Sequence, residues 1–215
     1  MKRLNFYFDF ISPYSFFAWR KISTLKGVEI NYLPVPLGSL LNHWGIKGPG
    51  EVTPKREFML KSCLRKAKKE NFSFTTPKTH PFNSLYALRL ALSEVAGPQQ
   101  AAVIACLWEA GWVKRIDMGE PEEILTALRE AGLPADELYE KSFSKEARAA
   151  LKSNLSQAIS QGVFGVPSFV VNEEMFWGQD SMEDLQLFID EKDPLDREKF
   201  EALLASTPRA ASQAL

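Results

Sequence analysis

Cysteine and histidine, which disulfide frameworks and most metal sites need, are scarce in this sequence. Its 215 residues include two cysteines, Cys63 and Cys106, and two histidines, His43 and His80. Two cysteines are too few for a disulfide framework, and no group of histidines and cysteines has the spacing of zinc ligands. We therefore expect no disulfide scaffold and no metal site. Both cysteines fall on apolar helix stripes, which predicts core positions.

An excess of charge of either sign is also absent. The chain has 26 basic and 27 acidic side chains and a formal net charge of −1. This balance gives no electrostatic reason to bind nucleic acid or an anionic membrane. Basic residues cluster only between Lys55 and Lys69. There we expect a solvated helix face, with the steering of an anionic substrate as the alternative.

Long apolar runs and secretory signals are missing as well. No apolar run approaches 18 residues, so the sequence predicts no membrane-spanning helix. The apolar segment after Met1 is interrupted by Asp9 and by Ser12-Pro13, and no signal-peptide cleavage pattern follows. We expect a cytoplasmic protein that binds neither membranes nor nucleic acid.

The first part of the chain alternates between strand and helix patterns. Residues 4–10 place an apolar side chain at every second position, which is the period of a strand. Ser12 and Pro13 then predict a helix start, as N-cap and first helical residue, and Gly27 is expected to end that helix. Residues 28–32 alternate again, and prolines stop this second strand.

The middle of the chain is helical, and strand character returns near the end. Residues 53–161 predict five or six helices, one of them over 83–96, and no strand. Residues 168–171 and 175–177 form a hairpin pattern, and Ser181 is expected to cap one more helix.

The strands at the two ends of the chain must pair into one sheet, because neither end could cover its own apolar faces alone. We predict an α/β fold, namely a thioredoxin-like domain with an inserted all-helical domain. The discontinuous thioredoxin-like domain takes residues 1–40 and 162–193, and the inserted helical domain takes residues 41–161. Residues 194–215 form a C-terminal tail that lies on the surface or frays.

The turn after the first strand is the position where a thioredoxin-type fold carries its redox Cys-x-x-Cys motif. Here both sulfur positions are serine, Ser12 and Ser15, which excludes dithiol redox chemistry at this site. A hydroxyl beside the unpaired N–H groups of a helix N-terminus favours an anion, such as a thiolate brought by a ligand. Lowering a thiol pKa from about 8.5 to about 6.5 needs roughly 2.7 kcal/mol, which these donors could jointly supply. Taken alone, Ser12-Pro13 is more often only a helix cap.

Two later segments offer further binding groups. Val166 and Pro167 precede a strand, where a cis-proline would leave the backbone of Val166 free to pair with an extended peptide ligand. The alternative there is an ordinary edge-strand proline. Residues 176–181 place an amide and a carboxylate, Gln179 and Asp180, at a helix start. This suits a ligand end with an ammonium and a carboxylate group, although such a segment is also a capping motif.

Three segments, in this order and spacing, carry a resemblance to a known family: FYFDFISPYSFFAW, GVFGVPSFVV and FWGQDSMEDL. They resemble those of the 2-hydroxychromene-2-carboxylate isomerase family. That family is close kin to kappa-class glutathione transferases and a relative of the periplasmic disulfide oxidants. The resemblance extends from about Leu4 to Ile189 and includes Pro81–Ser84.

The resemblance implies a glutathione site. Ser12 matches the family's catalytic serine, which hydrogen-bonds the glutathione sulfur, and Val166 beside Pro167 matches the backbone that pairs with the cysteinyl part. Lys55 matches a lysine near the glycyl carboxylate or an acidic substrate. Four residues match the stretch that holds the γ-glutamyl end: Trp177, Gly178, Gln179 and Asp180. Phe82 is a candidate for the wall of an aromatic-substrate pocket, as are Trp108, Trp112 and Trp177, although aromatic residues on helices are more often core.

Three features depart from the family's pattern. Ile46 stands where an asparagine is usual, and Ser181 stands where an arginine is usual. Phe58 and Ser62 replace a frequent tyrosine and aspartate on the first inserted helix. Because the serine and proline segments are retained, we still expect glutathione binding, and the loop changes leave the substrate open.

We therefore expect a glutathione-dependent isomerase. It would convert 2-hydroxychromene-2-carboxylate, or a related intermediate of aromatic catabolism, to trans-o-hydroxybenzylidenepyruvate, with glutathione regenerated as a cofactor. The resemblance further implies a homodimer that acts on a small aromatic acid. One alternative is a kappa-like glutathione transferase or peroxidase that uses the same thiolate. The other is a non-catalytic thioredoxin-fold module that binds extended peptides or partners at the cis-proline edge.

Overall fold

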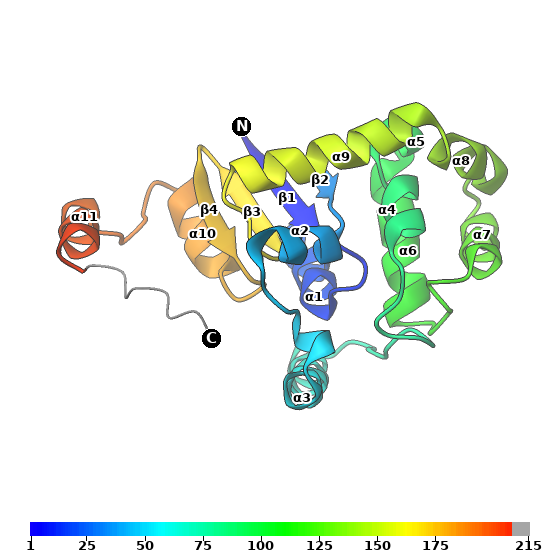
Figure 1. Cartoon of the computed structure of the whole chain (residues 1–215), viewed down its shortest axis with the longest axis horizontal. Helices are drawn as coiled ribbons and strands as arrows, with labels where there is room; N and C mark the ends of the chain where they lie inside the picture. The colour runs from blue at the N-terminus through cyan, green and yellow to red at the C-terminus, as the bar shows by residue number, and fades with distance from the viewer. Residues whose placement is uncertain (208–215) are drawn as a thin grey trace.

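A four-stranded mixed sheet lies at the centre of the structure, a computed structural model that describes residues 1–207 (Figure 1). The strand order is β2-β1-β3-β4. Strand β1 pairs in parallel with β2 and antiparallel with β3, and β3 and β4 form a hairpin. The pairing of β1 with β3 joins the two ends of the chain, which confirms the predicted single sheet. The strands are Lys2–Phe8 (β1), Val28–Pro34 (β2), Ser168–Val171 (β3) and Glu174–Trp177 (β4).

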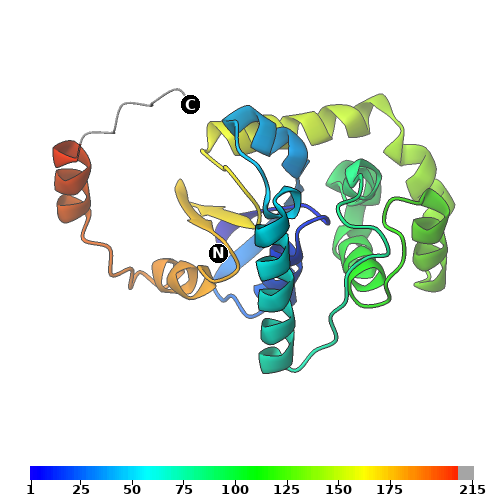
Figure 2. The same cartoon turned by 60° about the horizontal axis from the view of Figure 1, so that its bottom comes forward.

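Eleven α-helices surround this sheet within the described residues. Helices α4–α8 gather on one side of the sheet, and α11 lies beyond α10 on the opposite side of the molecule (Figures 1 and 2). The helices are Pro13–Ile22 (α1), Leu37–Trp44 (α2), Thr53–Glu70 (α3), Leu85–Leu90 (α4), Ser93–Ala96 (α5), Gln100–Trp112 (α6), Pro121–Glu130 (α7), Ala135–Ser142 (α8), Lys145–Ser160 (α9), Met182–Ile189 (α10) and Arg197–Ser206 (α11). Two 3₁₀ turns, Pro49–Glu51 and Gly97–Gln99, precede α3 and α6.

Both faces of the sheet are buried, so the chain has two hydrophobic cores. On one face Phe6, Phe8 and Phe169 pack in a large core whose other members come from α1, α3, α10 and the helical insertion. On the other face Tyr7 and Val170 pack in a smaller core with residues of α2 and of the C-terminal part of α9. Helix α9, the last helix of the insertion, therefore covers the sheet as well as extending the helical block.

The helical middle contains more and shorter helices than the sequence predicts. Residues 53–161 form seven α-helices where five or six were expected, because the predicted helix over 83–96 is divided into α4 and α5 and because α8 was not predicted. Helix α2 was missed as well. It begins directly after Pro36, which was expected only to end the second strand.

One predicted helix end is wrong, and one predicted N-cap residue makes no side-chain capping bond. Helix α1 starts with Ser12 and Pro13 as predicted, but it ends at Ile22, and Gly27 instead takes a left-handed conformation just before β2. Ser181 does not cap α10 with its side chain, because its hydroxyl donates to the carbonyl of Gly178 at 2.8 Å.

The predicted tail, residues 194–215, lies partly outside the described residues. Its described part contains α11, which has no buried residue and carries the exposed side chains of Phe200, Leu203 and Leu204. Within residues 1–207, no helix is both long and apolar enough to cross a bilayer.

The aromatic stack in the larger core predicts a strong dependence of stability on Phe6. Its ring lies 5.2 Å from that of Phe8 and 5.1 Å from that of Phe169, and the side chain is fully buried. We expect Phe6→Ala to lower the free energy of unfolding by about 3–5 kcal/mol, because it leaves a cavity among these rings. Urea denaturation measures this change. Phe200→Ala on α11, where the side chain is 46% exposed, is the control and should change stability by less than about 0.5 kcal/mol.

Candidate active site

A cavity of about 730 Å³ opens where the turn after β1 meets the loop before β3. Its walls come from six parts of the chain that are far apart in sequence. These are residues 9–14, the region 36–51 that contains α2, Met59 of α3, the segment 80–85 before α4, residues 164–166, and Trp177. The thioredoxin-like sheet and the helical insertion therefore build the cavity together.

Ser12 lies in the cavity wall at the N-terminus of α1 and is 5% exposed. Its hydroxyl caps the helix by accepting the N–H of Ser15 at 3.2 Å, and it donates a long bond of 3.4 Å to the carbonyl of Val166. A bond of that length is weak and can be exchanged for a stronger acceptor. The first-turn N–H of Tyr14 has no acceptor among residues 1–207. This helix end therefore has donors available for an anion.

Val166 and Pro167 face Ser12 across the cavity mouth. The peptide bond between them is cis, which confirms the predicted cis-proline. The N–H of Val166 has no acceptor among the described residues, and the carbonyl of Pro167 accepts the N–H of Gly178 at 2.9 Å. Gly165 lets the Trp177 indole approach closely, since a Cβ there would lie 2.8 Å from the indole nitrogen. The Trp177 side chain, 54% exposed, thus forms the rim of the cavity.

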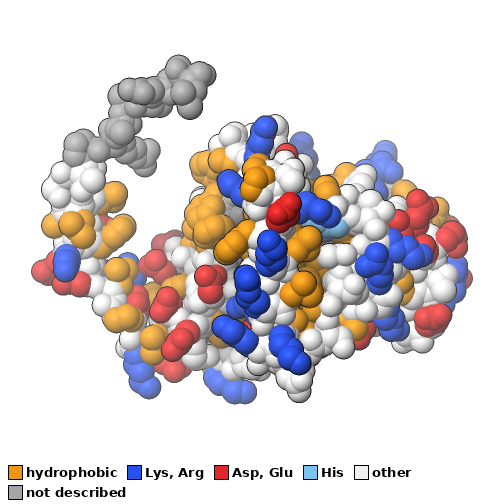
Figure 3. Space-filling view, turned by 90° about the horizontal axis from the view of Figure 1, so that it is seen from below, with side chains coloured by type: hydrophobic (Ala, Val, Ile, Leu, Met, Phe, Trp, Pro, Cys, Tyr) orange, Lys and Arg blue, Asp and Glu red, His pale blue; other side chains and the backbone are white. Residues whose placement is uncertain are grey.

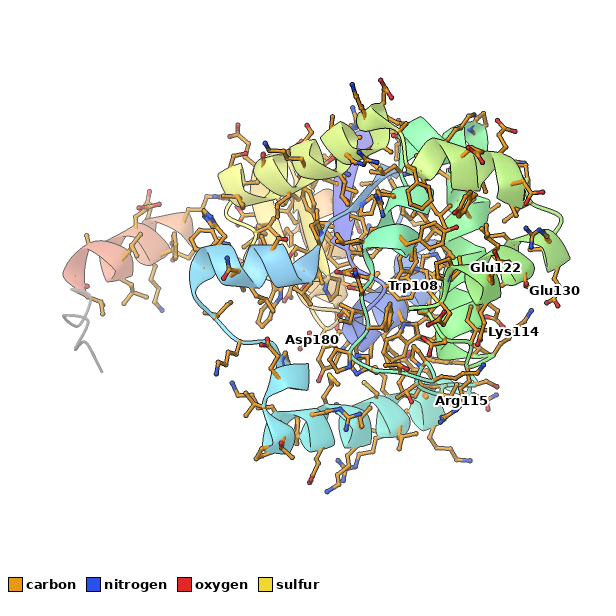
Figure 4. The ribbon with its side chains drawn as sticks, turned by 45° about the vertical axis from the view of Figure 1, so that its right-hand side comes forward. Trp108, Lys114, Arg115, Glu122, Glu130 and Asp180 are labelled. Carbon is orange, nitrogen blue, oxygen red and sulfur yellow. The ribbon has the colours of Figure 1, made fainter. Side chains whose placement is uncertain are left out.

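The loop after β4 is held in a fixed shape beside this rim. Gly178 has a φ of +95°, and a Cβ there would lie 2.5 Å from a carboxylate oxygen of Asp180. Glycine is therefore required at this position. Figure 4 shows Asp180 on the side of the sheet that faces α3. The hydroxyl of Ser181 adds a further bond to this turn.

Lys66 of α3 reaches this loop. Its ammonium group donates to the side-chain oxygen of Gln179 and lies 3.9 Å from Glu70. Burial lowers the Lys66 pKa, while Glu70 and Asp180 act in the opposite direction. Glu70 also binds Lys21 at 2.7 Å. Lys66 therefore contacts the loop that carries Asp180, and the two opposite charges are close enough for Asp180 to influence the Lys66 pKa.

Tyr14 lines the cavity and lies near Asp180 and Cys63. Burial raises the pKa of its hydroxyl, with Cys63 and Asp180 raising it further. Cys63, Lys66 and Glu70 share the inner face of α3, and Met59 on the same face lines the cavity. Helix α3 thus connects the cavity to the loop 178–181.

Two titratable groups in the cavity wall were not identified as site residues from the sequence. Asp9 is 1% exposed, and burial raises its pKa to about 6. His80 lies 2.9 Å from the carbonyl of Ile11 through Nε2, and burial lowers its pKa. Apolar pockets that hold perturbed titratable groups are the usual places for binding and catalysis.

The structure brings together most of the residues that the sequence singled out. Four of them line the cavity: Ser12, Phe82, Val166 and Trp177. Four lie directly beside it, on the cis-proline turn and the following loop: Pro167, Gly178, Gln179 and Asp180. Lys55 is separate from them, exposed in the first turn of α3 and outside the cavity wall. A different lysine, Lys47, lines the cavity next to Ile46.

The basic cluster on α3 has an exposed and a partly buried side. Figure 3 shows basic side chains along this face of the molecule. Most of the cluster is exposed, as expected for a solvated helix face: Lys55, Lys61, Arg65, Lys68 and Lys69. Lys66 belongs to the same run of residues but points inward to Gln179.

The site residues fit a glutathione molecule in three respects. The helix end at Ser12 has N–H and O–H donors for a thiolate, and the unpaired N–H of Val166 can donate to a carbonyl of an extended peptide backbone. The Asp180 and Lys66 pair is complementary to an amino-acid end that carries both charges. Within residues 1–207, no three His, Cys, Asp or Glu side chains are placed so that they could hold a metal ion.

Comparison with known proteins gives the family. Residues 3–190 match the model of the DSBA-like thioredoxin domain. A 2-hydroxychromene-2-carboxylate isomerase from Sphingobium xenophagum is 30% identical over 87% of this chain and 98% of its own length. Glutathione S-transferase kappa 1 from Caenorhabditis elegans is 24% identical over 91% of this chain and 94% of its own. The chain therefore belongs to the DSBA-like thioredoxin family, in the group that includes the 2-hydroxychromene-2-carboxylate isomerases.

A solved structure supports the fold assignment. A 2-hydroxychromene-2-carboxylate isomerase superimposes with a TM-score of 0.78 over 95% of this chain and all of that one, at 23% identity. At this identity the likeness shows the fold alone. It confirms the predicted thioredoxin-like fold with a helical insertion.

The burial of Cys63 predicts an unreactive thiol. Burial raises its pKa to about 12, so almost none of it is thiolate at neutral pH, and the thiolate is the reactive form. We expect neither Cys63 nor Cys106, whose pKa burial also raises, to react rapidly with DTNB at pH 7.5 in the native protein. Both should react in denaturant. Rapid native labelling of Cys63 would show that the inner face of α3 opens to solvent.

Proposed function

We propose that this protein is a glutathione-dependent isomerase of the 2-hydroxychromene-2-carboxylate type. The observation that supports this most is the meeting of Ser12, Val166 and Trp177 in one cavity with a serine, rather than a cysteine, at the helix N-terminus. A thiol needed for chemistry at that position must then come from a ligand. Relatives named as 2-hydroxychromene-2-carboxylate isomerases and as kappa glutathione transferases support both parts of the proposal.

In this proposal, bound glutathione supplies a thiolate that adds to a conjugated carbon of the opened chromene and leaves after rotation about the resulting single bond. The Ser12 hydroxyl gives up its 3.4 Å bond to Val166 and donates to the sulfur. The first-turn N–H of Tyr14 and the positive end of α1 add to the stabilisation of negative charge. The same donors lower the thiol pKa and hold the thiolate in place.

The remaining residues divide between the two ligands. The N–H of Val166 pairs with the cysteinyl part, and residues 177–180 hold the γ-glutamyl end, with Asp180 accepting its ammonium group. For a small aromatic acid, Phe82 and Met59 offer apolar walls, and Lys47 is the lysine in the cavity wall that can meet a carboxylate. Lys55 is exposed and outside the cavity wall, so we assign the contact with the substrate carboxylate to Lys47 instead. The cytoplasmic location and the homodimer expected from the resemblance stay predictions.

A kappa-like transferase is the second candidate, because relatives with that name align over nine-tenths of the chain. A transferase would use the same helix end and the same thiolate. The two reactions differ in whether glutathione is consumed.

The test is a spectrophotometric assay with 2-hydroxychromene-2-carboxylate, with and without glutathione, in which thiol consumption is followed in parallel. We expect conversion that requires glutathione and leaves its concentration unchanged. Glutathione consumption with an electrophile would indicate the transferase instead. Neither activity, together with an absence of glutathione binding, would favour the non-catalytic module.

Ser12→Ala should lower turnover by about 100-fold, since it removes one donor to a developing or stored negative charge. The substitution also removes a helix cap that contributes about 1 kcal/mol to stability. Ser144→Ala is the matched control, because Ser144 caps α9 in the same way through the N–H of Ala147 at 3.0 Å. We expect this control to lose similar stability and to keep full activity. Equal activity of the two variants would contradict the role of Ser12.

Lys66→Met should weaken glutathione binding by about tenfold, because it removes the cation beside Asp180 and Gln179 while keeping the length of the side chain. Lys69→Met, an exposed lysine one turn along α3, is the control and should bind normally. Isothermal titration calorimetry with glutathione and with the dipeptide Cys-Gly measures both variants. The affinity for Cys-Gly, which lacks the γ-glutamyl end, should be the same for all three proteins.

A further inference from the structure

Asp9 is a buried carboxylate that holds three walls of the cavity together. One of its oxygens, Oδ1, accepts the N–H of Ile11 at 3.0 Å, in the turn that leads to Ser12. The other, Oδ2, accepts the N–H of Leu37 at 2.8 Å, which is the first residue of α2. The hydroxyl of Ser84, at the start of α4, also stabilises the anion. A single side chain therefore links the turn bearing Ser12 to the first residues of two cavity-lining helices.

The turn between β1 and α1 is held on its other side as well. The carbonyl of Ile11 is bonded by His80, and the indole N–H of Trp112 donates to the carbonyl of Phe10 at 2.8 Å. Asp9 and His80 thus bind the N–H and the C=O of the same residue, directly before Ser12. The position of the Ser12 hydroxyl depends on these bonds, because the turn between Phe8 and Pro13 has little regular structure of its own.

We propose that the Asp9 carboxylate is a positioning residue of this site, which in its ionised form fixes the Ser12 turn against α2 and α4. The proposal rests on the proposed function for its effect on glutathione. Its structural part, the link from the Ser12 turn to α2, stands on the two hydrogen bonds that Asp9 accepts from Ile11 and Leu37. Ionisation matters because hydrogen bonds to a charged acceptor are stronger than bonds to a neutral acid.

Burial opposes this ionisation. Desolvation raises the pKa of Asp9 to about 6, although the bonds from Leu37, Ile11 and Ser84 lower it. As pH falls through about 6, the folded protein binds a proton before the unfolded chain does, so the ionised form is the less favourable one for the fold. Four other charged or titratable groups line the same cavity, Tyr14, His80, Lys47 and Glu51, and Arg56 faces the carbonyl of His80. Burial lowers the pKa of His80 from its usual value, and the test must separate this group from Asp9.

The test follows the amide protons of Ile11 and Leu37 by two-dimensional ¹H–¹⁵N NMR between pH 4.5 and 8, in protein without ligand. We expect both signals to shift together with one midpoint near pH 6, and the shift to be absent in Asp9→Asn. Ser84→Ala, which removes one bond that favours the anion, should raise the midpoint. Signals that do not titrate, that titrate separately, or that still titrate in Asp9→Asn would overturn the link, the last result indicating His80.

A binding measurement tests the effect on the site. S-methylglutathione has no thiol to titrate, so its affinity reports on the protein alone. For the wild type we expect binding to be about fivefold weaker at pH 5 than at pH 7.5, and for Asp9→Asn to be weak and independent of pH. Affinity of the wild type that is constant across this range would overturn the positioning role. Amides that titrate as expected in a protein that binds no glutathione would leave the link intact and overturn the proposed function.

Stability separates positioning from a merely structural role. Asparagine relieves the cost of burying a charge but keeps only one of the two acceptor oxygens, so Asp9→Asn should lose little stability at pH 7.5 while losing affinity. A large loss of stability in Asp9→Asn would mean that Asp9 serves the fold instead. Asp136→Asn, an exposed aspartate that pairs with Arg129 on the far helices, is the control and should leave the binding of S-methylglutathione unchanged.

Discussion

The antiparallel pairing of β1 with β3 is the interaction on which the site depends. It joins Asn5, Phe6 and Tyr7 to Val170, Phe169 and Ser168, segments more than 160 residues apart. The turn after β1 and the cis-proline before β3 consequently lie at the same end of the sheet, which is why Ser12 faces Val166. The stacked rings of Phe6 and Phe169 stabilise this register, because a slip of one residue would turn them to the opposite face. Without that register, neither half of the site would face the other.

The helical insertion supplies the cavity walls that the sheet does not. Strand ends provide Ser12, Val166 and Trp177, but the insertion provides Met59, His80 and Phe82, and α2 closes the cavity from a third side. Since α9 packs in the smaller core and α6 in the larger one, both faces of the sheet are attached to the same helical block. The two parts of the cavity are therefore fixed relative to each other by hydrophobic packing, and Asp9 adds a polar link at the point where they meet.

The parts of the fold and site that could be predicted are those with a local signal. The alternation around Phe6 predicted β1, and Ser12-Pro13 predicted the start of α1. The cis bond before Pro167 was expected from its match to the cis-proline position of thioredoxin-like folds. Helix α2 could not be predicted in this way, because Pro36 and Gly38 interrupt a short apolar pattern. Helix α2 is stabilised by packing on the smaller core, where Leu40 is fully buried.

The missed site residues were missed for a similar reason. Asp9 alternates with apolar neighbours, which is typical of a solvent-facing strand position, and its burial follows only from the placement of α2 and Ser84 above it. Lys66 stands among several other cations, and only the position of the loop 178–181 distinguishes it from them. Such features arise when distant segments meet, so no window of the sequence contains them. Lys55 shows the converse, a residue that matched a pattern but lies outside the cavity wall.

Because residue 12 is serine, the N–H groups at the start of α1 have no protein thiolate to stabilise. In a site with its own cysteine, helix N–H groups act on a thiolate that is covalently fixed. Under the proposed function they act on a thiol that arrives by diffusion, so the site would need a means to orient the rest of that ligand. The Val166 backbone and the loop 178–181, where Lys66 donates to Gln179, would meet that need, while Met59 and Phe82 belong to the apolar lining of the cavity. The apolar part then stays available for a second molecule, and the hydroxyl of Ser12, bonded only weakly to Val166, lies between the two.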